Sequence, residues 1–307
     1  MNRFTAKLLT FYIPNKEKRR KKRQKLLGVV KNEDEIIEKN IRFHSAMGVD
    51  GFIVTNHNST DKTLAILEKL KKEGLVLEIF NETSVRHQHN IWVDKMVKVA
   101  KYKYHATWVI NADADEFYYS KDLDLKVSIS KFPKLNAIKV ESIFLFPTDC
   151  DNIFDNVYFL KNPIEDYHLE NLSETDIWMK EFSLKGARTC PKVLHKTKGF
   201  KAIAAGNHAV KMRNLCLGNN VDIVLYHYHV VNYRRYAEKA KRWAETGKLL
   251  TPGENYLTRI TGLLKQNKLR QDYDSKYGPS IKKKLEEMGV ISKDYSVINF
   301  MKHKGLL

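Results

Sequence analysis

Short apolar runs alternate with segments of helical periodicity through the first third of the chain. The apolar runs have the length of buried strands and cover residues 25–30, 51–56, 75–80 and 107–111. Apolar residues three or four positions apart predict helices between these runs: from Asn32, as N-cap, to about Met47, around Ile66, Leu67 and Leu70, and around Val93, Val97, Ala100 and Tyr104. Strands and helices that alternate in this way predict a parallel α/β sheet.

The regular alternation ends after Phe117. Further short strands are expected at residues 137–146, 192–195, 208–212 and 222–229. From Tyr233 onward the pattern is helical, with breaks at Pro252 and at Gly278-Pro279. We therefore expect an N-terminal arm (1–24), an α/β domain (25–232) and a helical C-terminal region (233–307).

Three polar clusters directly follow predicted strands. They are Lys31-Asn32-Glu33, residues 56–61, and Asp113-Ala114-Asp115-Glu116. The carboxyl ends of parallel strands lie at one edge of a sheet, and ligands of such sheets bind at that edge. The sequence thus predicts that its most reactive side chains lie along one rim.

The acidic cluster has the composition of a cation site. Three carboxylates within four residues repel one another unless a cation or solvent compensates their charge. A hard divalent cation binds carboxylate oxygens and keeps positions open for the phosphates of a substrate. The alternative is an acidic turn or helix start that is merely solvated, since short acidic motifs are common by chance.

The charge is uneven along the chain. In total, 54 Lys and Arg against 36 Asp and Glu give a net charge of +18. Residues 1–25 hold ten basic residues against one acid, Glu17, and so carry +9 of this excess. Such an arm suits an anionic membrane surface or the phosphates of a nucleic acid, or it is a solvated tail. We favour the membrane, because apolar residues such as Phe11 precede the basic run.

The rest of the composition suggests a cytoplasmic protein that touches the inner face of a membrane. The cysteines, Cys150, Cys190 and Cys216, form neither a disulfide framework nor a zinc pattern, which indicates a reducing compartment. No stretch approaches the ~20 apolar residues of a membrane span.

Three motifs in order carry a family resemblance. They are Gly28–Glu33 (GVVKNE), Gly48–Thr63 (GVDGFIVTNHNSTDKT) and Trp108–Phe117 (WVINADADEF). Together they resemble glycosyltransferase family 2, in the branch whose acidic motif ends in Asp-Glu-Phe. The resemblance implies the GT-A type fold of nucleotide-diphospho-sugar transferases: a mainly parallel sheet flanked by helices. Within 25–232 it implies a nucleotide-sugar-binding half (25–120) and an acceptor half (121–232).

The resemblance also implies roles for residues of the first half. Val30 and Glu33 would line the nucleotide, and Asn56 stands where many members have an Asp that contacts the base. Asp61 would bind the donor, or alternatively cap the following helix. Arg86 is available for the diphosphate unless its segment is a solvated loop. Asp113 would lie near the ribose and, with Asp115, bind Mn²⁺ or Mg²⁺.

Histidines of the second half are the remaining metal candidates. GT-A enzymes often take a further metal ligand from a histidine here, which points to His208 or His227. His227 and His229 alternate with Tyr226 and Tyr228, so both imidazoles face the same side of a strand. A structural role is the alternative for each. Similar proteins show a His-Tyr pair before a helix with a lysine, matched here by His227-Tyr228 and Lys239.

An acid near the acceptor would serve as the catalytic base of an inverting transfer. The candidates are Glu141, Glu165, Asp166, Asp176 and Glu181. Their spacing singles out none of them. We favour Glu165-Asp166, because paired acids after Pro163 suggest an exposed loop.

The expected function is transfer of a sugar from a nucleotide-sugar, most simply a UDP-sugar, to a glycan or glycolipid acceptor of a surface polysaccharide or lipopolysaccharide. One rival is a basic nucleic-acid-binding protein, but the charge gathers in one arm rather than along an aromatic-studded face, so no nucleic acid is expected. Another rival is a sugar nucleotidyltransferase. That chemistry favours a Gly-rich phosphate loop after the first strand, where this chain has Lys31-Asn32-Glu33-Asp34.

Overall fold

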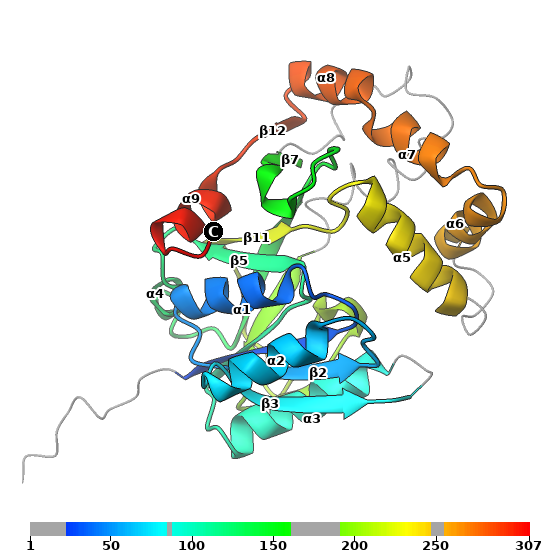
Figure 1. Ribbon diagram of the computed structural model, residues 1–307. Coiled ribbons are helices and arrows are strands. Elements are labelled where there is room, and N and C mark those ends of the chain that lie inside the picture. Colours follow the sequence, from blue (N-terminus) through cyan, green and yellow to red (C-terminus); the bar gives the residue numbers. More distant parts are fainter. Residues whose placement is uncertain (1–22, 85–87, 161–190, 247–254) are drawn as a thin grey trace, which may run out of the picture.

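An eight-stranded sheet lies at the centre of the protein (Figure 1). The computed structural model describes residues 23–84, 88–160, 191–246 and 255–307. Across the sheet the strand order is β3-β2-β1-β4-β8-β6-β11-β5. In chain order these strands are β1 (Gln24–Val30), β2 (Phe52–His57), β3 (Val76–Glu82), β4 (Trp108–Asn111), β5 (Glu116–Ser120), β6 (Ala137–Phe144), β8 (Lys192–Lys196) and β11 (Leu217–His227).

Two small sheets and nine helices complete the described part of the chain. The small sheets pair β10 (Val210–Met212) with β9 (Phe200–Ile203) and β12 (Ile291–Lys293) with β7 (Tyr158–Leu160). The helices are α1 (Ile37–Ala46), α2 (Thr63–Lys72), α3 (His89–Tyr102), α4 (Leu125–Ser130), α5 (Tyr233–Thr246), α6 (Asn255–Lys265), α7 (Leu269–Tyr277), α8 (Pro279–Glu287) and α9 (Ser296–His303). None of these helices has the length and apolar character needed to cross a membrane.

Helices cover both faces of the parallel half of the sheet. Strands β3, β2, β1 and β4 pair in parallel. Side chains alternate between the faces, so Leu26 and Val54 pack with α1 and α2, while Leu27 and Ile53 pack with α3 and the β9–β10 hairpin. Strands β1, β2 and β4 are nearly continuous apolar runs because both of their faces are buried, whereas the edge strand β3 is only partly buried and includes Glu78 and Glu82. The carboxyl ends of these strands form one rim, as predicted.

The first helix starts later than predicted, and the prediction of Asn32 as its N-cap is wrong. Helix α1 begins at Ile37, and Asn32 has a left-handed backbone with φ of 54°. The Asn32 Oδ1 atom accepts a hydrogen bond from the backbone N–H of Thr60 at 2.8 Å. Asn32 therefore ties the loop after β1 to the loop after β2, and it uses its side chain there instead of capping a helix.

The second half of the sheet is mixed. Strand β6 pairs in parallel with β11, whereas β8 runs antiparallel to β4 and β6, and β5 runs antiparallel to β11. The sequence did not predict β5, because Glu116–Ser120 directly continues the acidic motif. Strand β11 begins at Leu217, five residues before its predicted start, and ends at His227.

The C-terminal region is helical, as predicted, with one short strand added. Helices α5 to α8 share an apolar cluster with the end of β6, built around Phe146, Tyr236, Tyr273 and Tyr277. Gly278 separates α7 from α8, at the predicted break. The predicted fold class, a mainly parallel α/β sheet flanked by helices with a helical C-terminal region, is confirmed.

Two fully buried histidines should make the fold sensitive to acid. His44 donates from Nδ1 to the Asn40 carbonyl and accepts at Nε2 from the Tyr118 N–H, and burial lowers its pKa to about 3. Burial likewise lowers the pKa of His195 to about 4. Below the unfolded pKa of about 6.5, only the unfolded chain takes up these two protons. The stability that the neutral histidines contribute is therefore fully present above pH 6.5 and is lost as the pH falls below it.

We expect His44 and His195 together to lower the free energy of unfolding by about 3 kcal/mol between pH 7.5 and pH 5.5, with about half from each of them. His229, whose pKa burial also lowers, should add to this drop. Urea denaturation at the two pH values measures this difference. A His303→Gln variant is the control, since His303 is exposed, and it should show the same drop. Equal stability of the wild type at both pH values would contradict the neutral, buried state of His44 and His195.

Candidate metal and donor site

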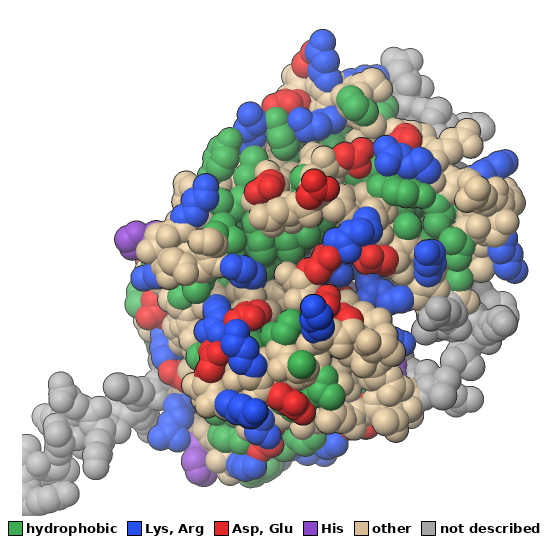
Figure 2. All heavy atoms as spheres, in the orientation of Figure 1, with side chains coloured by type: hydrophobic (Ala, Val, Ile, Leu, Met, Phe, Trp, Pro, Cys, Tyr) green, Lys and Arg blue, Asp and Glu red, His purple; other side chains and the backbone are tan. Residues whose placement is uncertain are grey.

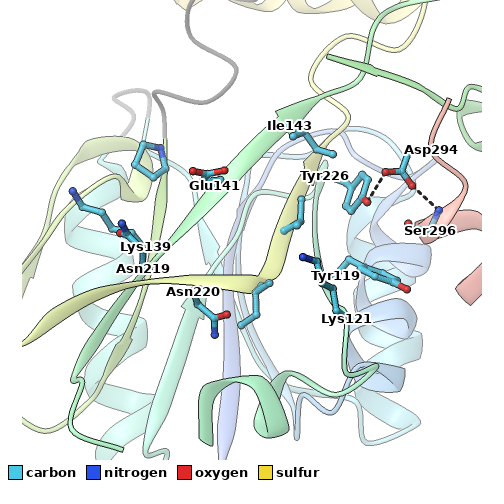
Figure 3. Close-up of a pocket in the computed structure, with 13 residues that line it drawn as sticks. Tyr119, Lys121, Lys139, Glu141, Ile143, Asn219, Asn220, Tyr226, Asp294 and Ser296 are labelled. Carbon is cyan, nitrogen blue, oxygen red and sulfur yellow. Dashed lines mark hydrogen bonds between the residues drawn. The ribbon is translucent and has the colours of Figure 1, made fainter. Parts of the chain in front are cut away.

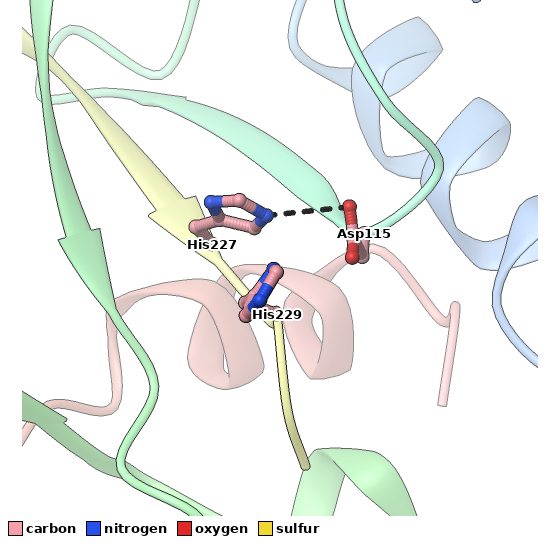
Figure 4. A group of neighbouring side chains, drawn as sticks. All are labelled: Asp115, His227 and His229. Carbon is pink, nitrogen blue, oxygen red and sulfur yellow. Dashed lines mark ion pairs between the residues drawn. The ribbon is translucent and has the colours of Figure 1, made fainter. Parts of the chain in front are cut away.

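A carboxylate and two imidazoles converge where the acidic motif meets the end of β11 (Figure 4). One ligand atom from each of Asp115, His227 and His229 lies within 4.8 Å of the others. The Nε2 atom of His227 lies 3.5 Å from the Asp115 carboxylate. The backbone explains the approach: β5 and β11 pair with His227 opposite Glu116, and the Tyr228 N–H donates to the Asp115 carbonyl at 2.8 Å.

The donor atoms of this cluster fit a divalent metal. One carboxylate oxygen and two imidazole nitrogens are ligands that Mn²⁺ accepts, whereas Mg²⁺ prefers oxygen alone. Burial lowers the pKa of His229 well below its usual range, so its imidazole is neutral, as a metal ligand must be. Burial opposes ionisation of Asp115, but Lys239 and His227 outweigh it and hold the pKa of that carboxyl well below its usual range.

A lysine of α5 supplies a cation to the same cluster. The Lys239 Nζ atom lies 3.1 Å from Asp115 Oδ2 and 3.3 Å from His229 Nδ1. It also donates to the His229 carbonyl at 2.5 Å. Because this ammonium contacts both Asp115 and His229, it lies in the space that a metal bound to both would need. A metal and Lys239 in this position exclude each other.

A second ion pair lies behind the acidic motif. Glu116 is fully buried, and its carboxylate lies 2.7 Å from Lys192 Nζ. Its other oxygen accepts from the Asp113 backbone N–H at 3.1 Å, which closes the turn of the motif. Burial would lower the pKa of Lys192, but Glu116 and Asp113 outweigh burial and raise it, so the ammonium stays charged. Glu116 therefore holds the motif in shape rather than facing a ligand.

Two arginines of α5 face the loop after β1. Arg235 Nη2 lies 3.3 Å and Arg242 Nη1 lies 3.5 Å from the carboxylate of Glu33. Arg242 also donates to the Lys31 carbonyl at 2.8 Å. Burial and the nearby charge of Asp115 raise the pKa of Glu33. With Lys239, helix α5 thus presents three cations to the rim of the parallel strands.

The other residues predicted to bind the donor lie along the same rim with mixed contacts. Val30 ends β1 and is buried, and Asn56 near the end of β2 donates to the Asn81 side chain at 3.1 Å. Asp61 accepts from the Thr63 N–H at 2.9 Å and from the Asp34 N–H at 3.2 Å. Asp61 thus makes the capping contact that was the alternative to donor binding.

Two of the predicted metal ligands are described by the structure but lie outside the cluster of Asp115, His227 and His229. Asp113 is 38% exposed and pairs with Lys192 at 3.5 Å. His208 donates from Nδ1 to the Pro191 carbonyl at 3.2 Å. Glu141, an unselected candidate for the base, lies on the opposite face of the sheet from His227, because it is paired with Val224 across β6 and β11. Arg86, Glu165 and Asp166 fall outside the described residues.

Several residues of this site were not predicted from the sequence. His229 completes the cluster, and the alternation of His227 and His229 along the strand was the signal for it. Lys239 was matched to a pattern but given no role. Lys192, Arg235 and Arg242 carried no sequence signal, because only the folded chain brings them to the rim.

The comparison with family models identifies the family of the chain. The family model of glycosyltransferase family 92 matches residues 28–267, and the chain belongs to this family. It is a glycosyltransferase, as predicted; the closer resemblance to family 2 stays a prediction. No curated protein matches the chain significantly.

Solved structures with a similar course of the chain are also glycosyltransferases. TarS from S. aureus (residues 1–349, with UDP-GlcNAc) is 13% identical with a TM-score of 0.41, covering 91% of this chain and 79% of that one. The mannosyltransferase PcManGT from Pyrobaculum calidifontis, solved with GDP-Man and Mn²⁺, is 13% identical with a TM-score of 0.42, covering 92% and 80%. At these scores no residue role is transferred from either protein.

Proposed function

We propose that this glycosyltransferase moves a sugar from a nucleotide-sugar donor with the help of a divalent metal, Mn²⁺ or Mg²⁺, held by Asp115, His227 and His229. One observation carries the proposal: a carboxylate and two imidazoles converge beside the rim of a parallel sheet. Bound there, the metal would neutralise the diphosphate that leaves as the bond to the sugar breaks.

The surrounding residues would bind and orient the donor. Val30, Glu33 and Asn56 lie along the rim where a nucleotide would bind, and Asp113 is exposed enough to reach the ribose. The cations of α5 favour an anionic diphosphate at this position. The proposal keeps residues 25–120 as the donor half, and it adds α5 of the C-terminal region to the site. Arg86 is proposed for the diphosphate on the sequence pattern alone.

We propose a UDP-sugar as donor, a glycan or glycolipid as acceptor, and inversion at the anomeric carbon with Glu165 or Asp166 as the base. His208 stays a candidate for a further metal ligand, as the sequence predicts. On the face shown in Figure 2, acidic and basic side chains are interspersed, and this gives the nucleic-acid alternative no support there.

A panel of nucleotide-sugars tests the donor and the metal together. Chelator-treated protein should release the nucleotide slowly from every donor, and added Mn²⁺ should raise the rate most for UDP-sugars. The same rates with and without metal would reject the metal-dependent mechanism. A preference for a GDP-sugar would reject only the choice of UDP.

The basic arm would hold the enzyme at an anionic membrane. Its net charge of +9 over residues 1–25 supplies the attraction, at about 1 kcal/mol per cation before salt screening. A protein that starts at Gln24, the first residue of β1, should lose salt-sensitive sedimentation with phosphatidylserine vesicles, while its hydrolysis of a soluble donor persists. Equal sedimentation of both proteins would exclude membrane docking by the arm.

A further inference from the structure

A cavity opens on the face of the sheet opposite the candidate metal site. It has a volume of about 730 Å³ and is lined mainly by β5, β6 and β11 (Figure 3). Tyr226 lines it, whereas the next residue, His227, belongs to the metal cluster. Successive side chains of a strand point to opposite faces. The sheet itself therefore separates this groove from the candidate metal site.

The aromatic ring that is partly exposed in the groove is that of Tyr119, and its neighbour Tyr226 is only 4% exposed. The rings of Tyr119 and Tyr226 lie edge to face, with centroids 6.0 Å apart and planes at 83°. The Tyr226 hydroxyl donates to Asp294 at 2.9 Å, so this ring is fixed by the segment between β12 and α9. In Figure 3, Tyr226 and Asp294 lie on one side of the groove, and Lys139, Glu141 and Asn219 lie on the other.

Three polar side chains of the groove are available to a ligand. Lys139, Glu141 and Asn219 form no hydrogen bond or ion pair through their side chains with any other residue in the described part of the chain. Between them they offer an ammonium donor, a carboxylate acceptor and an amide that does both. Two lysines, Lys121 and Lys139, are balanced by the two acids Glu141 and Asp294. A groove balanced in this way does not select for an anion such as phosphate.

We propose that this groove binds a neutral oligosaccharide segment. Sugar rings have apolar faces that pack on aromatic rings, and rims of hydroxyls that both donate and accept hydrogen bonds. The partly exposed ring of Tyr119 matches the first property, and Lys139, Glu141 and Asn219 match the second. The volume is in the range of sites for small organic ligands. The choice of a saccharide over other neutral polar ligands rests on the proposed function, because a glycan is the acceptor and product of that reaction.

The position of the groove defines what the site would do. A glycan segment on this face cannot reach Asp115 through the sheet, so the groove would hold a remote part of an acceptor or product chain. Such a site raises the affinity for long glycans over short ones without taking part in the chemical step.

Binding of defined tetrasaccharides tests the groove directly. We would titrate the full-length protein with cellotetraose, maltotetraose, chitotetraose and mannotetraose and follow saturation-transfer difference NMR. The test variant is Lys139→Ala/Asn219→Ala, because these two residues face each other across β6 and β11. The control is Lys98→Ala/Gln266→Ala, which removes an exposed lysine and an exposed amide outside the groove.

We expect at least one tetrasaccharide to bind the wild type and the control, and to bind the test variant at least tenfold more weakly. Donor hydrolysis by the test variant should equal that of the wild type, so failure of the proposed reaction would appear in hydrolysis and failure of the groove in binding. The proposal is overturned if no tetrasaccharide gives a saturable signal, or if the test variant binds as tightly as the control.

Discussion

Asp115→Asn should lower the rate of donor hydrolysis by about a thousandfold while the protein stays folded. Among the described residues, Asp115 supplies the only carboxylate of the proposed metal cluster. The amide of the asparagine side chain that replaces it is a far poorer metal ligand. Loss of the charge stabilisation of a leaving group costs about 10²–10³-fold or more in rate. Steady-state hydrolysis of UDP-sugars with saturating Mn²⁺ measures the effect.

Asp151→Asn is the matched control for this substitution, since Asp151 is exposed and lies outside the site. It should hydrolyse the donor at the wild-type rate. Circular dichroism and thermal unfolding show whether both variants are folded. A folded Asp115→Asn protein with activity within threefold of the wild type would remove Asp115 from the mechanism.

Lys239→Met should tighten the binding of Mn²⁺ about fivefold. The ammonium contacts both Asp115 and His229, so a metal must displace it before it can bind to both residues. An ion pair that is only partly shielded from water contributes roughly 1 kcal/mol, which corresponds to about fivefold in affinity. Isothermal titration of chelator-treated protein with Mn²⁺ measures the change independently of turnover.

Lys241→Met is the control on the same helix, because Lys241 is exposed and points away from the cluster. Its affinity for Mn²⁺ should equal that of the wild type. If Lys239→Met binds Mn²⁺ no more tightly and the wild type retains its activity in chelator, then Lys239 itself is the cation that acts on the diphosphate. The two results together separate a metal-dependent mechanism from a lysine-dependent one.

The parallel half of the fold could be predicted because its signal is local. Strands β1, β2 and β4 are buried on both faces, so each reads as an apolar run between amphipathic helices, and the partly buried edge strand β3 still begins with the apolar pair Val76-Leu77. The start of α1 could not be predicted, because Asn32 is a good N-cap by type and only its contact with Thr60 explains its left-handed backbone. Strand β5 was missed because its partner, β11, lies about a hundred residues away in sequence.

The site was predictable only where one strand or one motif carries the pattern. The acidic motif and the alternating histidines singled out Asp115 and His227, and the structure brings these two residues together. Asp113 was chosen from the acidic motif and His208 from the family resemblance, but the described structure places both outside the cluster. The cations of α5 and Lys192 reach the site through long-range packing, which no local pattern encodes.

Whether the cluster of Asp115, His227 and His229 holds the catalytic cation is tested most directly by the Mn²⁺ dependence of donor hydrolysis. We would measure it for the wild type, for His227→Ala and for His229→Ala, with His303→Ala as an exposed control. Each cluster variant should need at least tenfold more Mn²⁺ for half-maximal rate, whereas His303→Ala should match the wild type. An unchanged Mn²⁺ requirement in both cluster variants would contradict the proposed metal site.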